Sequence, residues 1–386
     1  MNNRHNIFKE TFNLLFGGFD IPLILIILSL FVVSTFTIYS ASIGSPVDMW
    51  QHFRNVGLAI FIIWLIAQIP PNVIMQFAIP IYTVGISLLV GVMLFGLVKK
   101  GAQRWLNIGI TVIQPSEILK IAVPLMLAWY YHKREQSINT LDYIVGLIIV
   151  AIPFVLIAKQ PDLGTAVLVL AAGFYVIFLA GFSWKIIIPL LIIGITGISL
   201  IVSFEHTLCL PEQSWQPLLH DYQKHRICTL LDPSSDPLGK GFHILQSMIA
   251  IGSGGVVGKG WLNGTQSRLE FIPEKHTDFI FAVYSEEFGL IGNIILMFIY
   301  TLLIFRSLFI ASNANILFSK LIAGAISLMF FTYVFVNVGM VSGILPVVGV
   351  PLPFMSYGGT AFATLGMCIG ILMSIARHKP NMRYRY

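Results

Sequence analysis

The carboxylate with the clearest chemical potential in this sequence is Asp278, which directly precedes a long apolar run that begins at Phe279. A carboxylate in that position can cap the first turn of a helix, a role that commonly contributes about 1 kcal/mol. It can equally act as a general base at the boundary between water and lipid, with His276 and Glu274 adjusting its proton affinity. Spacing alone leaves both roles open.

Other charged residues lie inside or beside apolar segments. A charge at membrane depth costs about 2.5–3.5 kcal/mol on insertion scales, so it requires a partner or a polar cavity. Glu117 and Lys120 are three residues apart and can pair on one helix face. Helix packing explains that pair when it is taken alone, and capping explains Asp162. Glu286 has no basic residue near it in the sequence, so it needs a cation, water or a lysine from another helix.

Motifs for several other chemistries are missing from the sequence. It has no zinc-ligand spacing, no Gly-rich nucleotide loop and no Ser/His/Asp order. Glycines at 252–255 and 258–260 can offer backbone N–H groups to a phosphate, but short Gly-rich loops are common. The net charge is +6, yet no basic helix or aromatic-interleaved basic patch accompanies it, which predicts no nucleic-acid partner.

The composition requires these residues to be held by a membrane protein. Of 386 residues, 56% are hydrophobic and only 10% are charged, and the mean hydropathy is +0.85. A soluble globular protein carries roughly 25% charged residues, so the solvent around this chain must be lipid. Arg4 and Lys9 precede the first apolar run and no small-residue cleavage site follows them, which predicts an uncleaved signal anchor.

The apolar runs predict an all-α polytopic fold with about ten transmembrane helices in a single membrane domain over 1–386. The predicted spans are 21–40, a hairpin over 55–98 broken at Pro70-Pro71, one from Pro115 to His132, 142–158, 163–183, 185–204, 279–305, and two within 320–376. A Pro/Gly-rich stretch, Gly343 to Gly359, separates the last two spans. The long polar segment 205–277 interrupts the series.

Lys and Arg predict the orientation. An even number of spans places both termini on one side, and the tails and short loops on that side carry more Lys and Arg than the opposite loops. The positive-inside rule therefore predicts cytoplasmic termini and a large extracytoplasmic loop over 205–277. Cys209 and Cys228 share that loop and can form a disulfide if the compartment is oxidising. Cys368 lies in an apolar run and is explained by packing.

A series of motifs resembles the SEDS family, whose members include RodA, FtsW and SpoVE. The most specific is the stretch from Asn337 to Ala361, which contains GILPVVGVPLPFMSYGGT, residues 343–360. The other matching blocks, in family order, are 102–105, 114–117, 159–165, 246–247, 252–255 and 273–279. The resemblance covers the chain apart from its first twenty residues, and the short N-terminus is more like RodA than FtsW. The segment 208–228 matches no family motif and reads as a lineage-specific insertion.

The resemblance implies a peptidoglycan glycosyltransferase of the bacterial cytoplasmic (inner) membrane. Such enzymes polymerise lipid II, a disaccharide-peptide carried on undecaprenyl diphosphate, into glycan strands during cell elongation and maintenance of cell shape. The resemblance also implies a partner, a class B penicillin-binding protein that cross-links the strands. By analogy Asp278 is the essential acid, and the residues around it would be Arg104, Trp105, Glu117, Lys120, Asp162 and Glu286.

The expected chemistry assigns a role to each charge. Asp278 is the expected base, assisted by His276, and it is also the expected ligand of a divalent cation, Mg²⁺ or Mn²⁺. Arg104, Lys120 and Lys159 are expected to balance the charge of the leaving diphosphate. A single dominant carboxylate suits direct displacement with inversion at the anomeric carbon.

Two other functions remain open at this stage. A lipid II flippase would use intramembrane charges along its path, although the sequence shows no inverted repeat. A non-catalytic scaffold of the division or elongation machinery would need no base at Asp278.

Overall fold

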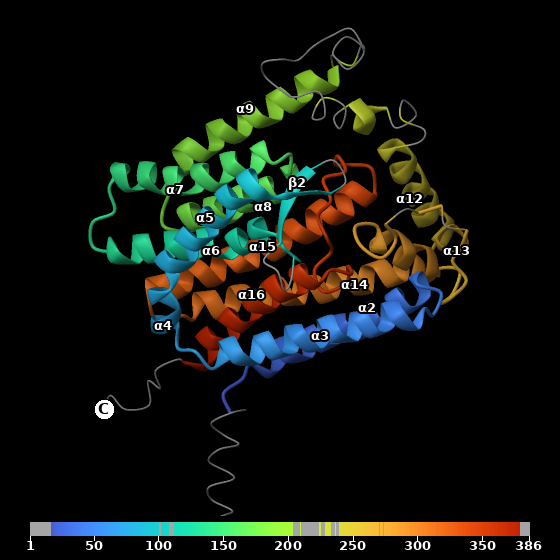
Figure 1. Cartoon of the computed structure of the whole chain (residues 1–386), viewed down its shortest axis with the longest axis horizontal. Coiled ribbons are helices and arrows are strands. Elements are labelled where there is room, and N and C mark those ends of the chain that lie inside the picture. The colour runs from blue at the N-terminus through green and yellow to red at the C-terminus, as the bar shows by residue number, and fades with distance from the viewer. Residues whose placement is uncertain are drawn as a thin grey trace, which may run out of the picture.

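Long apolar helices, lying side by side, make up most of the molecule (Figure 1). The computed structural model describes residues 17–99, 102–107, 112–203, 209, 224, 228–232, 236, 239–269, 271–272 and 274–378. Most of 205–238 and the first sixteen residues therefore lie outside the described part of the chain.

The helices follow the predicted spans closely. Up to the long polar segment they are α2 (Ile21–Ala41), α3 (Pro46–Ala67), the short α4 (Pro71–Gln76), α5 (Ala78–Phe95), α6 (Pro115–Lys133), α7 (Thr140–Lys159), α8 (Leu163–Leu179) and α9 (Trp184–Ser203). After it come α12 (Lys240–Gly254), α13 (Thr265–Arg268), α14 (Ile280–Ser312), α15 (Leu317–Val341) and α16 (Gly359–Arg377). Within the described residues, seven are long and apolar enough to cross a membrane: α2, α3, α5, α7, α14, α15 and α16.

The fold is mostly helical, as predicted, and it also contains one small sheet that the sequence did not predict. A small antiparallel sheet joins α5 to α6, with strands β1 (Leu97–Lys99), β2 (Ala102–Asn107) and β3 (Val112–Ile113) in the order β1-β2-β3. The stretch between the two helices pairs with itself, which satisfies backbone groups outside the helices. Arg104 and Trp105 lie on the central strand, so they belong to a paired strand and not to a plain connecting loop.

The start of one helix and the polar segment also differ from the prediction. Helix α3 begins at Pro46 and not at Asn55, because Ser45 caps it and its charged residues do not interrupt the helix. The polar segment contains the helix α12, which packs against α14. Polar composition alone gave no signal for that helix.

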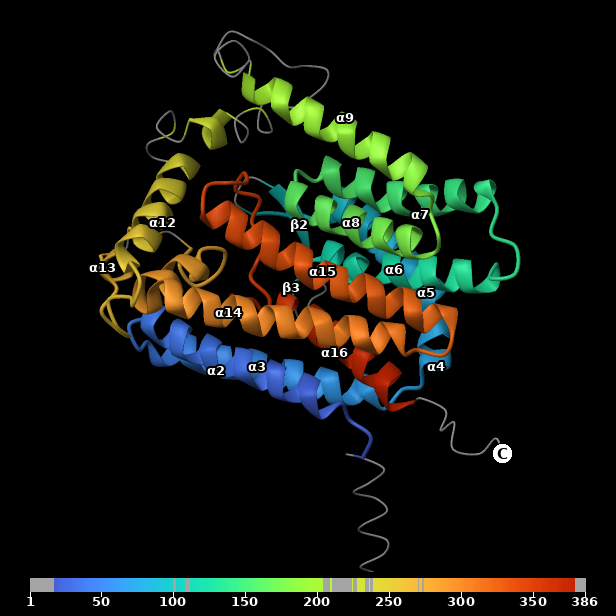
Figure 2. The ribbon, with the colours of Figure 1, turned by 180° about the vertical axis from the view of Figure 1, so that it is seen from behind.

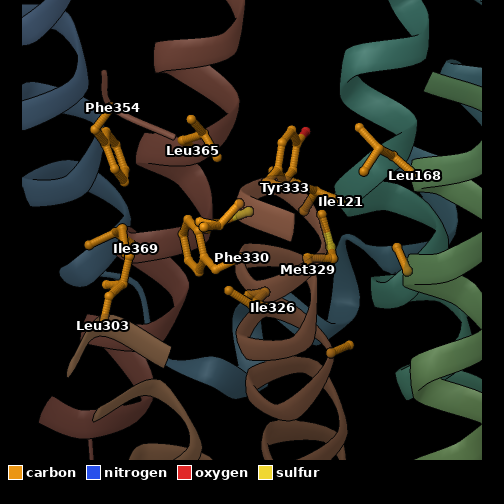
Figure 3. Close-up of a cluster of buried hydrophobic side chains, with 14 of the residues drawn as sticks. Ile121, Leu168, Leu303, Ile326, Met329, Phe330, Tyr333, Phe354, Leu365 and Ile369 are labelled. Carbon is orange, nitrogen blue, oxygen red and sulfur yellow. The ribbon is translucent and has the colours of Figure 1, made fainter. Parts of the chain in front are cut away.

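The packing places α15 at the centre. Helices α14, α8 and α6 all contact it, while α16 packs against α3 and α2 packs against α14 (Figures 1 and 2). Figure 3 shows the apolar core that results, where Ile326, Met329 and Phe330 of α15 face side chains of α6, α8 and α16. Tyr333 lies at one end of this cluster.

Helix α14 is broken at Gly289, where φ is 62° and ψ is −160°. The loop that follows α12 supplies the hydrogen bonds that the break removes. Lys259 N donates to Glu286 O and Gly260 N to Glu287 O, both at 3.0 Å, and Leu290 N donates to Gly255 O at 2.9 Å. The loop that follows α12 is therefore anchored to α14 at its break.

This anchoring depends on a glycine at 258. Its φ is +81°, and a Cβ there would lie 2.1 Å from Glu287 O. We expect Gly258→Ala to destabilise the protein by roughly 1–3 kcal/mol, because the strain falls on backbone that cannot move away. The matched control is Gly252→Ala at the end of α12, where an added Cβ meets nothing within 4 Å. Thermal unfolding of the two purified variants would show this, and equal melting temperatures would contradict it.

Candidate active site

A cavity of about 700 Å³ opens between the small sheet, the first turns of three helices and the Pro/Gly-rich loop 343–358. Most of the predicted charges line it. The lining residues that the sequence had already singled out are Arg104, Trp105, Glu117, Lys120, Asp162 and Asp278. Segments far apart in the chain therefore meet around one polar space.

Asp278 lies at the cavity wall, half-buried, just before α14. The N-cap of that helix is Phe279, whose side chain makes no capping bond, so α14 begins one residue later than a cap at Asp278 would place it. Across from the carboxylate lies Gly349, whose φ is +76°, and a Cβ on it would stand 3.3 Å from Asp278 Oδ2. The carboxylate is thus seated against bare backbone of the Pro/Gly-rich loop.

Glu117 and Lys120 form the predicted pair in the first two turns of α6. Lys120 Nζ lies 2.6 Å from Glu117 Oε1 and donates to the hydroxyl of Tyr333 at 2.8 Å. Lys120 is fully buried, and Glu117 is 8% exposed. Thr364 of α16 donates to the second oxygen of Glu117 at 3.4 Å. The pair therefore joins α6 to α15 and α16 while it lines the cavity.

Arg104 and Asp162 face each other on the other wall. Arg104 Nη1 lies 3.7 Å from Asp162 Oδ1, and Gln114 donates to Asp162 Oδ2 at 3.0 Å. Arg104 also donates to the carbonyl of Pro161. Asp162 caps α8 as well, accepting from Thr165 N at 3.5 Å, so its predicted structural and cavity positions are both observed. The Nε atom of Arg104 is buried with no hydrogen-bond partner within the described chain.

His276 lies behind the cavity wall and is not among the lining residues. Its carbonyl accepts from Tyr357 N at 2.7 Å, which joins the segment before α14 to the Pro/Gly-rich loop. Burial, and then the adjacent charge of Lys275, lower the pKa of His276 below its ordinary value. The imidazole is therefore neutral near pH 7, and it can adjust Asp278 only as a neutral polar group.

Besides His276, two further predicted residues, Lys159 and Glu286, do not line the cavity. Lys159 is exposed at the end of α7 and does not line it. Glu286 is fully buried elsewhere, with Lys259 Nζ at 2.6 Å and Thr265 N at 2.9 Å from Oε1. The lysine that Glu286 required comes from the loop after α12, so this carboxylate anchors that loop. Sequence spacing could not show this, because the partner is 27 residues away.

Sequence reasoning missed several polar residues at this site. Tyr333 and Thr364 complete the Glu117–Lys120 cluster, and Asn337 contacts the backbone of Asp278. Gln51 accepts a hydrogen bond from the Tyr357 hydroxyl, and Tyr357 lines the cavity. For Tyr333, Asn337 and Thr364 the signal available in the sequence was a polar side chain inside an otherwise apolar span. Such a side chain costs free energy in the membrane unless it has a partner.

The ligands that the site could offer to a metal ion are few. Among the residues that the structure describes, no three His, Cys, Asp or Glu side chains lie close enough to hold a metal ion by themselves. A cage built only from protein ligands therefore does not fit this part of the chain. Mg²⁺ is commonly bound by one or two carboxylates together with substrate phosphates, and Asp278 fits that pattern.

Known proteins resemble this chain over nearly all of its length. The family of cell cycle proteins that comprises FtsW, RodA and SpoVE matches residues 19–381. The peptidoglycan glycosyltransferase MrdB of Escherichia coli K12 is 49% identical, covering 94% of this chain and 95% of that protein. The peptidoglycan glycosyltransferase RodA of Treponema pallidum is 32% identical, covering 93% and 98%.

Solved structures show the same fold. A chain of a peptidoglycan synthase complex, solved for the structural coordination of polymerization and crosslinking, has a TM-score of 0.76 and 30% identity, covering 93% of this chain and 98% of that chain. The rod shape determining protein RodA of Thermus thermophilus has a TM-score of 0.68 at 24% identity, covering 94% and 98%, which supports the fold alone. By its sequence over nearly its whole length, this chain belongs to the FtsW, RodA and SpoVE family of cell cycle proteins.

Proposed function

We propose that this protein is a peptidoglycan glycosyltransferase of the RodA type, which polymerises lipid II into glycan strands during cell elongation and shape maintenance. The observation that carries the proposal is a cavity whose wall brings the carboxylate of Asp278 together with the cations Arg104 and Lys120. Relatives that are peptidoglycan glycosyltransferases and match over nearly their full length support it. Polymerisation of lipid II by the purified protein with its partner tests it.

The proposed reaction is a direct displacement. Asp278 accepts the proton of the acceptor sugar hydroxyl, whose oxygen attacks the anomeric carbon of the donor. The bond from that carbon to the diphosphate breaks, and the diphosphate leaves with the electron pair. The configuration at the anomeric carbon inverts, because the attacking oxygen enters opposite the leaving diphosphate in a single displacement.

Arg104 and Lys120 are the cations proposed to balance the leaving diphosphate. Both line the cavity, whereas Lys159, predicted for the same role, does not. The Nε atom of Arg104 is buried and has no hydrogen-bond partner among the residues that the structure describes, which supports an anionic ligand, because a buried donor without a partner costs about 1–3 kcal/mol. Lys120 is already paired with Glu117, so contact with a diphosphate would make it a shared donor.

A divalent cation, Mg²⁺ or Mn²⁺, is proposed as an additional component. Asp278 would hold it together with the diphosphate oxygens, and it would supply positive charge to the leaving group.

The chain is a multi-pass protein of the bacterial inner membrane. We propose ten spans, with α6, α8 and α9 added to the seven long apolar helices. Both termini would then be cytoplasmic and 205–277 extracytoplasmic. A disulfide between Cys209 and Cys228 supports an oxidising compartment for that loop. The site would lie at the outer leaflet, where the sugars of the carrier lipid are found.

This topology predicts which sites a membrane-impermeant thiol reagent can reach. A cysteine introduced at Val257, which is 76% exposed in the loop after α12, should be labelled in intact spheroplasts. A cysteine at Leu141, 73% exposed near the start of α7, should react only after permeabilisation. Cys368 is buried and should stay unlabelled in both cases. The reverse pattern for Val257 and Leu141 would overturn the orientation.

The proposed partner is a class B penicillin-binding protein, which would cross-link the strands as they emerge. The similar chain from a synthase complex that coordinates polymerization with crosslinking supports this choice. A lipid II flippase or a scaffold remains the alternative. Neither of them requires Asp278 as a base, so substitution of that carboxylate separates the alternatives from the proposal.

A further inference from the structure

Asn337 is a fully buried residue near the C-terminal end of α15. Its side-chain amide donates to the carbonyl of Asp278 at 2.9 Å and to the carbonyl of Val350 at 2.7 Å. Asp278 and Val350 both line the cavity but belong to segments far apart in the chain. A single side chain therefore joins the backbone that carries the candidate base to the backbone of the Pro/Gly-rich loop.

The second of these contacts also controls the surroundings of the carboxylate. Val350 follows Gly349, and a Cβ on Gly349 would lie 3.3 Å from Asp278 Oδ2. Asn337 thus holds the loop at the Val350 carbonyl, and the Asp278 carboxylate lies against the same loop at Gly349. Movement of either carbonyl away from Asn337 would change the position of the carboxylate relative to that wall.

The amide group is well matched to this double contact. An asparagine side chain has two N–H donors on one nitrogen, and both carbonyls are acceptors. The Oδ1 atom of Asn337 is buried and finds no hydrogen-bond partner in the described part of the molecule, so the donors are what the site uses. Aspartate has nearly the same shape but would place an oxygen against both carbonyls. Serine would keep one donor on a shorter side chain.

We propose that Asn337 is a positioning residue, which holds the Asp278 carboxylate in the place from which it takes the proton of the acceptor sugar hydroxyl. This inference rests on the proposed function of Asp278 as the base. Asn337 does not itself line the cavity, so it acts through the backbone of Asp278 and Val350. Misplacement of a reacting group by about 1 Å can lower a rate by roughly 100-fold. The effect should therefore fall on kcat and not on substrate binding.

The test measures lipid II polymerisation by the full chain, purified with its penicillin-binding partner, as kcat per folded molecule and as KM. Asn337→Asp is expected to lower kcat by about 100-fold, with KM within roughly threefold of the wild-type value. Asn337→Ser, which keeps one donor, should lose about tenfold in kcat. The matched control is Ser327→Ala on the same helix. The buried Ser327 hydroxyl donates to Ala323 O at 2.7 Å, one turn earlier in α15. It should keep the wild-type kcat.

Several results would overturn the inference. A purely structural role of Asn337 would lower the yield of folded protein and leave kcat per folded molecule unchanged. A raised KM with an unchanged kcat would make Asn337 a binding residue. If Asn337→Asp does not fold, Asn337→Ser decides, and failure of both to fold assigns the residue to folding alone.

The same assay keeps this inference distinct from the proposed function. Near-normal activity of Asp278→Asn would show that Asp278 is not the base, and it would rule out the proposed reaction. An inactive Asp278→Asn beside a fully active Asn337→Asp would leave the reaction in place and remove only the positioning role.

Discussion

Asp278→Asn is expected to abolish lipid II polymerisation while the protein is still made, inserted and folded. The substitution keeps the shape of the side chain and removes its ability to accept a proton. A positioned general base commonly contributes about 10²–10⁴-fold in rate, so that much should be lost. Folding should be spared, because Asp278 is not the N-cap residue of α14 and is only half-buried. The measurement is glycan synthesis by equal amounts of folded wild type and variant, each with the partner.

Glu135→Gln is a suitable control for this experiment. Glu135 is an exposed carboxylate beyond the end of α6, with His132 Nδ1 at 3.3 Å from its Oε2, and it does not line the cavity. The variant should therefore polymerise lipid II at the wild-type rate. Near-normal synthesis by Asp278→Asn would instead favour a flippase or a scaffold.

Removal of one charge from the Glu117–Lys120 pair should damage the protein severely. Lys120 is fully buried and Glu117 nearly so, and the loss of either leaves the other without its counter-ion. Breaking a buried ion pair in this way costs about 3–5 kcal/mol. Glu117→Ala and Lys120→Ala should therefore show low yields of folded protein and low melting temperatures. Wild-type stability of either variant would contradict the structural importance of the pair.

The double substitution Glu117→Lys with Lys120→Glu separates packing from chemistry. It keeps the pair but moves the positive charge by about one helical turn, away from the Tyr333 hydroxyl that Lys120 contacts. If Lys120 also contacts the diphosphate, the exchanged protein should fold and remain inactive, which is the result we expect. Near-wild-type polymerisation by the exchanged protein would remove the diphosphate role and leave packing as the explanation.

The membrane fold could be predicted from the sequence because each span is a local feature. About 20 apolar residues must form a helix in lipid, since no water is present to satisfy the backbone. The predicted runs therefore correspond to helices, including 21–40 to α2 and 163–183 to α8. The small sheet and the helix α12 were missed, because polar segments between spans, whether short or long, carry no comparable constraint.

The sequence by itself also determined the family and the residue types of the site. The string from Gly343 to Thr360 and the block that ends in Asp278 identified the family, and the membrane cost of Glu117 predicted a partner for it. Lys120 was the right partner, because residues three apart meet on one helix face whatever the rest of the fold does.

Only the tertiary structure decided which charges share the cavity. Glu286 resembled a site residue in the sequence, yet the break of α14 at Gly289 and the loop that bonds to it place Lys259 beside it, away from Asp278. Asn337 lies in the family signature and had no role assigned from the sequence, yet its side chain joins Asp278 to Val350. The physical reason is the same in both cases. A buried polar group must find a partner, but the partner's identity depends on which backbones the helix packing brings within about 3 Å of each other.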